Sequence, residues 1–239
     1  MSSRLEELDW QQTPMGELTL RRRHDPLVDA EVYEVKLGDE YLMSSLFTLA
    51  EEELARLGLD AATGDSLQVL VGGLGLGYTA VTALDDARVA SMTVVDALPA
   101  VIDWHERHLL PVSARLVGDA RTRLELGDFF ALMRDAAGAV AGSPYDAILL
   151  DVDHSPRHQL NPSHADLYTV DGLRRLRGHL TLGGVFALWS DDPPDGAFMA
   201  DLEAVFPGAQ AHVVPFDNPL TGGVSSNTVY VAVARGSEG

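Results

Sequence analysis

Residues 67–79, which read LQVLVGGLGLGYT, decide the fold of this chain. The stretch opens with a short, mostly apolar run, which is typical of a buried parallel strand. A glycine-rich turn follows, and a helix is predicted from Tyr78 to Leu84. Glycines between a strand and a helix let a ligand approach the backbone closely. The binding candidates in this turn are Gly73, Gly75 and Gly77.

Strands and helices alternate from this turn to the end of the chain, which predicts an α/β fold with an open parallel sheet. The further strands are predicted at 92–95, 123–126, 145–151 and 183–189, with two last strands near 210–216 and 227–234. The further helices are predicted from Pro99 and from Phe129, over 165–179 and over 197–205. Two strands in succession at the end indicate an antiparallel hairpin at one edge of the sheet.

The N-terminal part has a different pattern, with apolar and polar residues in strict alternation. The predicted elements are strands over 16–21 and 31–37, a turn at Gly38-Asp39 and a helix over 47–57 that Gly58 ends. We therefore expect a small antiparallel β region with a linking helix over residues 1–62. The larger α/β domain is expected over residues 63–239.

Composition narrows the classes of function. The 239 residues contain 17 Lys and Arg against 36 Asp and Glu, which gives a formal charge of −19, and there is no Cys. Nucleic acid is therefore not an expected partner, and thiolate metal sites and Cys nucleophiles are excluded. No apolar run approaches the ~18 residues of a membrane span, so no membrane partner is expected. The acidic opening is not typical of a secretory signal, and we expect a cytoplasmic protein whose charge suits a cationic ligand.

Carboxylates end the next two predicted strands. Asp96 follows the glycine turn by about twenty residues, where a carboxylate can accept hydrogen bonds from both ribose hydroxyls. Gly127-Asp128-Phe129 ends the following strand, where Asp128 can accept from an adenine amino group and Phe129 can pack on the ring. For Asp96 or Asp128 alone, the alternative is that it caps the helix that follows. The glycine turn and both carboxylates in register favour a nucleoside site.

The fourth predicted strand delivers Asp151 to the same edge, where it could position and deprotonate an attacking amine. The alternative is a turn and a helix cap. If the fourth and fifth strands are neighbours, Asp151 shares one cleft with Asp153, Asp191 and Asp192, which favours a polyamine or a divalent cation. The alternative for Asp191 and Asp192 is solvated surface acid.

Other residues nearby carry weaker signals. A zinc site made by His154, His158 and His164 is disfavoured because Pro156 prevents the helix that i, i+4 spacing needs, and we expect no metal. Tyr168 either closes the pocket or packs in the core. The chain has neither a nucleophile elbow nor a P-loop. The candidates on the substrate side are Asp153, His154, Tyr168, Trp189 and Asp191.

These motifs resemble the spermidine synthase (polyamine aminopropyltransferase) family, within the class I S-adenosylmethionine-dependent methyltransferase fold. Four segments carry the resemblance: Val69–Gly77 to the cofactor loop, Val95–Ile102 to the acidic motif, Gly127-Asp128 to the adenine-contacting pair and Tyr145–Asp151 to the catalytic strand. The resemblance implies a Rossmann-like seven-stranded sheet with a small N-terminal β domain. It also implies that S-adenosylmethionine or its decarboxylated form is the co-substrate and that Asp151 is the catalytic residue.

The chain departs from the family pattern at three places. Leu76 stands where the family usually has an Asp that contacts the cationic amine of the decarboxylated cofactor. Residues 151–156 read DVDHSP in place of Asp-Ser-Ser/Thr-Asp-Pro. Residues 41–46 read YLMSSL where the family carries a Tyr-His-Glu triplet.

Three functions follow as hypotheses. The first is a transferase that moves an aminopropyl group from decarboxylated S-adenosylmethionine to a small amine acceptor. The second is a methyltransferase that uses S-adenosylmethionine on a small amine or another nucleophile, and the third is a catalytically silent nucleoside-binding protein of the same fold. An NAD-dependent oxidoreductase is disfavoured by the glycine spacing and the antiparallel end. An exposed N-terminal sheet would be open to pairing with a second copy, so a homodimer is one further expectation.

Overall fold

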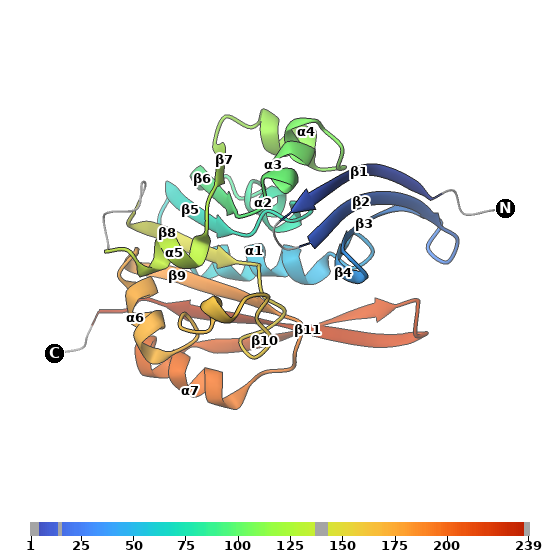
Figure 1. The fold of residues 1–239 in the computed structure, drawn as a ribbon. Helices are drawn as coiled ribbons and strands as arrows, with labels where there is room; N and C mark the ends of the chain where they lie inside the picture. Colours follow the sequence, from blue (N-terminus) through green and yellow to red (C-terminus); the bar gives the residue numbers. More distant parts are fainter. Residues whose placement is uncertain (1–4, 14–15, 137–142, 237–239) are drawn as a thin grey trace.

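The structure of this chain is a computed structural model that describes residues 5–13, 16–136 and 143–236. These residues form a four-stranded sheet and a seven-stranded sheet that lie side by side (Figure 1). The small sheet is antiparallel, as predicted, and its strands follow one another in chain order. They are β1 (Glu6–Thr13), β2 (Gly16–Asp25), β3 (Ala30–Leu37) and β4 (Glu40–Ser44).

The large sheet has the strand order β10-β11-β9-β8-β5-β6-β7. The five strands from β9 to β7 in this order are parallel to one another. Strands β10 and β11 form an antiparallel hairpin at one edge, so the predicted topology is confirmed. The strands are β5 (Leu67–Gly72), β6 (Val89–Asp96), β7 (Thr122–Leu126), β8 (Tyr145–Leu150), β9 (Leu180–Ser190), β10 (Gln210–Asn218) and β11 (Gly223–Val233).

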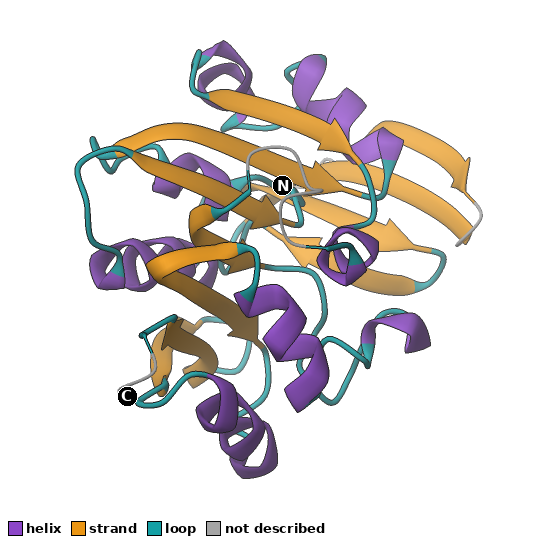
Figure 2. Ribbon diagram, turned by 90° about the vertical axis from the view of Figure 1, so that its left-hand side faces the viewer, coloured by secondary structure: helices purple, strands orange, loops and turns teal. Residues whose placement is uncertain are grey.

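Helices cover both faces of the large sheet (Figure 2). One face packs against α1 (Leu49–Ala61), α2 (Tyr78–Ala83), α3 (Pro99–Glu106) and α4 (Ser113–Gly118), and the other against α5 (Phe129–Arg134), α6 (Val170–Arg177) and α7 (Gly196–Val205). Both faces are covered because successive side chains of a strand point to opposite faces of the sheet. In β5, Val69 and Val71 belong to the first core, on the side of α1, and Leu70 belongs to the second, on the side of α5. Leu18 and Leu20 of the small sheet are buried in the first core too.

Two predicted helices differ from the observed ones. Gly58 does not end α1, which continues to Ala61 and packs on β8, β9 and β11. A Cβ atom at Gly58 would lie 2.6 Å from Cδ2 of Leu149, so the glycine permits close helix–sheet contact instead of stopping the helix. The helix predicted over 165–179 is only α6, and a short 3₁₀ turn, Pro162–His164, precedes it.

The physical reason for the late start of α6 is its cap. The side chain of Thr169 accepts a hydrogen bond from the backbone N–H of Gly172, which fixes the first turn there. Three observed elements, β1, β4 and α4, were not predicted from the sequence.

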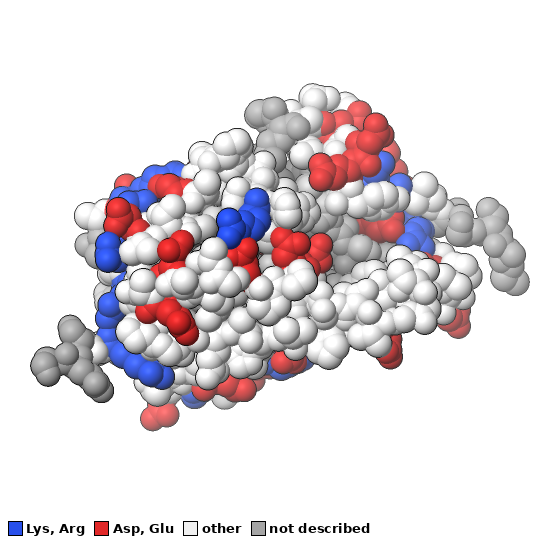
Figure 3. Space-filling view, turned by 90° about the horizontal axis from the view of Figure 1, so that it is seen from below, with Lys and Arg blue, Asp and Glu red and all other residues white. Residues whose placement is uncertain are grey.

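The charged side chains lie in groups on the surface. One face of the molecule carries groups of acidic side chains beside smaller groups of Lys and Arg (Figure 3). In the described parts of the chain, no helix combines the length and the apolar character that crossing a membrane would take.

Candidate active site

A cavity of about 300 Å³ opens at the carboxyl ends of β5, β6, β7 and β8. This edge of a parallel sheet is where ligands bind in open α/β folds. Ten of the thirteen site residues proposed from the sequence line the cavity: Gly73, Gly75, Gly77, Asp96, Gly127, Asp128, Phe129, Asp151, His154 and Trp189. Three others do not line it: Asp153, Tyr168 and Asp191.

The glycine turn is built for close approach of two backbones. Gly73 has a φ of +93°, and a Cβ atom there would lie 1.9 Å from the backbone oxygen of Asp151. Gly77 has a φ of +90°, and a Cβ atom there would lie 2.8 Å from Cε1 of His105. Any side chain at these two positions would push the turn away from the end of β8 or from α3.

His105 supports the turn from beneath and was not predicted from the sequence. Its Nε2 lies 3.0 Å from the backbone oxygen of Gly75, and its Nδ1 lies 3.1 Å from Oγ of Ser113. A carbonyl oxygen only accepts, so Nε2 carries the hydrogen and Nδ1 accepts from the serine hydroxyl. Burial lowers the pKa of His105, which keeps the ring neutral in this arrangement.

Asp96 stands at the end of β6 and ties the glycine turn to that strand. Its carboxylate accepts from the backbone N–H of Leu74 at 2.9 Å and of Leu98 at 2.8 Å. Burial raises the pKa of Asp96, and these amide hydrogen bonds act in the opposite direction. Oδ2 also has a long contact of 3.5 Å from the backbone nitrogen of Gly75, whereas Oδ1 keeps a second lone pair with which the group can accept from a ligand in the cavity.

Asp128 fits both interpretations given from the sequence. It caps α5 by accepting from the backbone N–H of Ala131 at 3.1 Å, and it also lines the cavity. Phe129 is buried beside Gly72, where a Cβ atom would lie 2.5 Å from Cδ2 of the phenylalanine ring. The aromatic ring therefore forms part of the cavity wall next to a backbone free of side chains.

Asp151 follows β8 and faces the cavity. Its backbone N–H donates to the backbone oxygen of Gly72 at 2.8 Å, which continues the strand pairing into the site. The hydroxyl of Thr79 donates to Oδ2 of Asp151 at 2.8 Å. Burial raises the pKa of Asp151 to about 6, so the group is mostly ionised at neutral pH and able to take up a proton.

Glu51, in the first turn of α1, is the second acid at this end of the cavity and was not predicted from the sequence. Its backbone oxygen lies 3.2 Å from the same Thr79 hydroxyl that contacts Asp151. Burial, together with the negative charge of Asp151, raises the pKa of Glu51 to about 8. In the sequence this residue opens a run of three glutamates, which looks like a solvated helix face.

The charges around the cavity are of one sign. The described lining residues include no Lys and no Arg, and they include the carboxylates Glu51, Asp96, Asp128 and Asp151. The indole N–H of Trp189, another lining residue, is buried and has no hydrogen-bond partner among the described residues. A positively charged ligand with a hydrogen-bond acceptor would satisfy both features.

Comparison with known proteins agrees with this geometry. No protein-family model matches the chain. A curated polyamine aminopropyltransferase from Oceanobacillus iheyensis is 28% identical over 133 residues, which are 55% of this chain, and the chain spans about a quarter (24%) of that protein. A crystal structure of spermidine synthase from Thermotoga maritima superposes with a TM-score of 0.71 at 16% identity, over 95% of this chain and 72% of that one.

The chain has the fold of a spermidine synthase. A second spermidine synthase, in complex with the transition state analogue AdoDATO, gives a TM-score of 0.73 at 17% identity, over 95% of this chain and 73% of that one. Human methyltransferase-like protein 13, in complex with SAH, gives 0.53 at 22% identity over 80% of this chain and 79% of that one. The resemblance and the fold class predicted from the motifs are thus confirmed.

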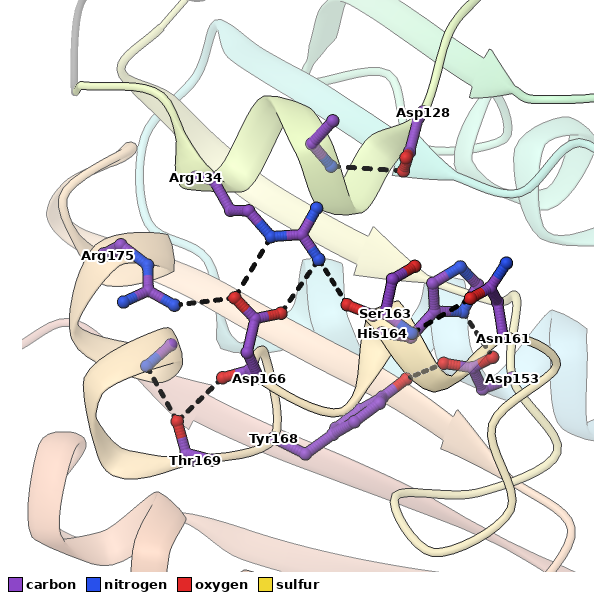
Figure 4. A network of polar contacts seen from close by, with 12 residues as sticks. Asp128, Arg134, Asp153, Asn161, Ser163, His164, Asp166, Tyr168, Thr169 and Arg175 are labelled. Atoms are coloured by element: carbon purple, nitrogen blue, oxygen red, sulfur yellow. Dashed lines mark hydrogen bonds and ion pairs between the residues drawn. The ribbon is translucent and has the colours of Figure 1, made fainter.

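The loop after β8 in this spermidine synthase fold is held by a buried polar network (Figure 4). Oδ1 of Asp153 accepts from the backbone N–H of Leu160 at 2.8 Å and contacts Nδ1 of His164 at 2.8 Å. The hydroxyl of Tyr168 donates to Oδ2 at 2.7 Å, and burial raises the pKa of Tyr168, so it stays protonated. The ring of His164 stacks on Phe130 with centroids 3.6 Å apart, and both rings line the cavity.

The expected cleft of four carboxylates is therefore corrected. The side chain of Asp153 is 0% exposed and holds the loop from inside, and Tyr168 packs instead of closing the pocket. Strands β8 and β9 are neighbours as supposed, but Asp191 turns aside and accepts from Nδ2 of Asn227 at 2.7 Å. Asp192 pairs with Nδ1 of His158 at 2.9 Å. The acid that lies beside Asp151 at this end of the cavity is Glu51 of α1.

The described side chains form no site that could bind a metal ion. Among the described residues, no three His, Asp or Glu side chains are grouped so that they could hold a metal ion.

Proposed function

We propose that this chain is a transferase that moves an aminopropyl group from decarboxylated S-adenosylmethionine to a small amine acceptor. The observation that carries the proposal is a cavity into which carboxylates come from the ends of β6, β7 and β8, namely Asp96, Asp128 and Asp151. The fold similarity to spermidine synthases supports the same reaction class. A cytoplasmic location, a homodimer and a domain division at residue 62 are further proposals.

The lining residues fit a nucleoside. Asp96 would accept from the ribose hydroxyls through its remaining lone pairs, Asp128 would accept from the adenine amino group, and Phe129 would pack against the base. A cavity of about 300 Å³ is at the small end of the range for ligand pockets. The unpartnered indole N–H of Trp189 offers a donor to a ligand atom. When bound, the donor supplies a carbon already activated by a sulfonium.

Asp151 supplies the proton chemistry. An amine that is protonated at neutral pH has no lone pair with which to attack, so a base must take its proton. The carboxylate of Asp151, with a pKa of about 6, is ionised at pH 7 and suited to that step. Thr79 holds Oδ2, which leaves Oδ1 to orient the acceptor nitrogen.

The charge of the cavity favours the decarboxylated donor. Intact S-adenosylmethionine has a carboxylate, which would need a cationic partner when buried. The cavity offers no Lys or Arg among its described lining residues, and Glu51 and Asp151 would repel that group.

Methyl transfer is the second candidate because of one residue. Leu76 lines the cavity and is 7% exposed, so the position that carries an Asp in the family contributes no charge here. This loss removes one group that would select an aminopropyl chain over a whole methionine chain.

Product analysis separates the candidates. The protein is incubated with a panel of diamines and either donor, and the products are identified by mass spectrometry. The proposal expects 5′-methylthioadenosine and an aminopropylated amine from the decarboxylated donor, whereas S-adenosylhomocysteine and a methylated product would support the second candidate. No product with either donor, together with unchanged ligand affinity in Asp151→Asn, would indicate a silent nucleoside-binding protein.

A further inference from the structure

Three consecutive glutamates on α1 have different environments. Glu52 and Glu53 pair with Arg56 on the outside of the helix, at 2.7 Å and 2.8 Å. Glu51 instead lines the cavity, and its carboxylate accepts from its own backbone N–H, whereas no side chain of the described residues donates to it. A mostly buried carboxylate without a cationic partner is costly unless a ligand supplies the positive charge.

The neighbours of Glu51 make this cost larger. Asp151 after β8, Asp191 after β9 and Glu52 on the same helix all act on it with negative charge, and Tyr78 of α2 is a further titratable group that interacts with it. In the protein without ligand, the Glu51 carboxyl therefore keeps its proton at neutral pH. A positive group between Glu51 and Asp151 would lower the pKa of both carboxyl groups and so favour their ionised forms.

Leu76 of the glycine turn lines the same cavity as Glu51 and brings no charge to it. The other lining carboxylates come from strand ends, so Glu51 is the one that α1 delivers to a cationic chain in the cavity.

We infer that Glu51, together with Asp151, binds a primary ammonium group of the reactants and releases its own proton when that group arrives. The inference rests on the proposed function and adds the residue that recognises the cationic chain. The shared chemistry is an alkylammonium, which either the decarboxylated donor or the diamine acceptor carries. The proton balance is simple, because the glutamic acid becomes a glutamate and one proton passes to the buffer.

Calorimetric titration tests the inference with three ligands. The ligands are decarboxylated S-adenosylmethionine, a diamine added to the complex with 5′-methylthioadenosine, and 5′-methylthioadenosine alone, which has no ammonium group. The Glu51→Gln variant should lose roughly 10- to 100-fold in affinity for whichever ammonium ligand Glu51 binds, and it should bind 5′-methylthioadenosine as wild type does. The arm that changes identifies the source of the ammonium. The control is Glu53→Gln, which makes the same change on the same helix beside Arg56 and should leave all three affinities unchanged.

Proton release provides the second measurement and needs no variant. Titrations at pH 7 in phosphate and in Tris, which differ in ionisation enthalpy, should show close to one proton released in wild type, and none in Glu51→Gln, on binding of the ammonium ligand whose affinity depends on Glu51. The inference is overturned if Glu51→Gln binds every ammonium ligand as tightly as wild type, or if wild type binds them without proton release. Loss of aminopropyl transfer alone would instead count against the proposed function, because binding of 5′-methylthioadenosine and of amines is measured separately.

Discussion

The hydroxyl of Thr79 donates to Oδ2 of Asp151 at 2.8 Å and so joins the first turn of α2 to the end of β8. The glycine turn that precedes α2 also meets the end of β8, because a Cβ atom at Gly73 would lie 1.9 Å from the backbone oxygen of Asp151. The glycine turn and the proposed base are therefore one rigid unit. A ligand that lies across the turn meets Asp151 in a fixed orientation.

Replacement of Asp151 by Asn should remove the base and keep the shape. We expect kcat with the decarboxylated donor and a diamine to fall by roughly 10²- to 10⁴-fold, because amine deprotonation loses its acceptor. Affinity for 5′-methylthioadenosine should stay within a few-fold of wild type, since that ligand presents no amine. A variant with near-normal kcat would show that another group takes the proton.

The Thr79→Val variant tests the link between α2 and the base. The threonine hydrogen bond lowers the pKa of Asp151 against the larger effect of burial, so its loss should raise that pKa above about 6. The base works when ionised, so the acidic limb of the profile of kcat/KM against pH should move to higher pH. Thr79→Ser keeps the hydroxyl and should leave the limb in place. An unmoved limb in Thr79→Val would mean that Asp151 does not set it.

Glu51→Gln should stabilise the protein without ligand at alkaline pH. The pKa of this carboxyl is near its ordinary value of 4.5 in the unfolded chain and about 8 in the folded protein, so wild-type stability falls as pH rises between these two values. The neutral amide lacks this penalty. We expect a Tm several degrees above wild type at pH 8.5 and little difference at pH 4.5. Equal Tm values at both pH values would show that Glu51 is not confined as described.

Gly58→Ala should destabilise the fold, although alanine is the better helix former. A methyl group there would lie 2.6 Å from Cδ2 of Leu149 and 3.1 Å from Cβ of Ala187, so α1 would have to move off the sheet. The free energy of unfolding, measured by urea denaturation, should fall by about 1–3 kcal/mol. Gly118→Ala is the matched control, because nothing lies within 4 Å of its added Cβ. A Gly58→Ala protein as stable as wild type would refute the packing argument.

The sequence predicts the large sheet well because its signals are local. Apolar runs such as Leu67–Val71, and the carboxylates that follow such runs, identify the strands and their common edge without any knowledge of packing. Gly58 misled the prediction because a glycine that ends a helix and one that permits contact with a sheet look alike until Leu149 is placed beside it.

The site was less predictable from sequence because its composition depends on where side chains turn. Asp153 is two residues from Asp151, yet it points into a network with His164 and Tyr168. Glu51 is a hundred residues away from Asp151 in the chain and reaches the cavity only because α1 packs across β8 and β9. No periodicity or motif in a run of three glutamates tells which one faces inward.

The most direct test of the central claim is a crystal structure with 5′-methylthioadenosine and a diamine. The account predicts the nucleoside across the glycine turn, with its ribose hydroxyls on Asp96, and a diamine nitrogen within hydrogen-bond distance of Asp151. A nucleoside bound elsewhere, or a cavity filled by side chains with no diamine beside Asp151, would contradict it.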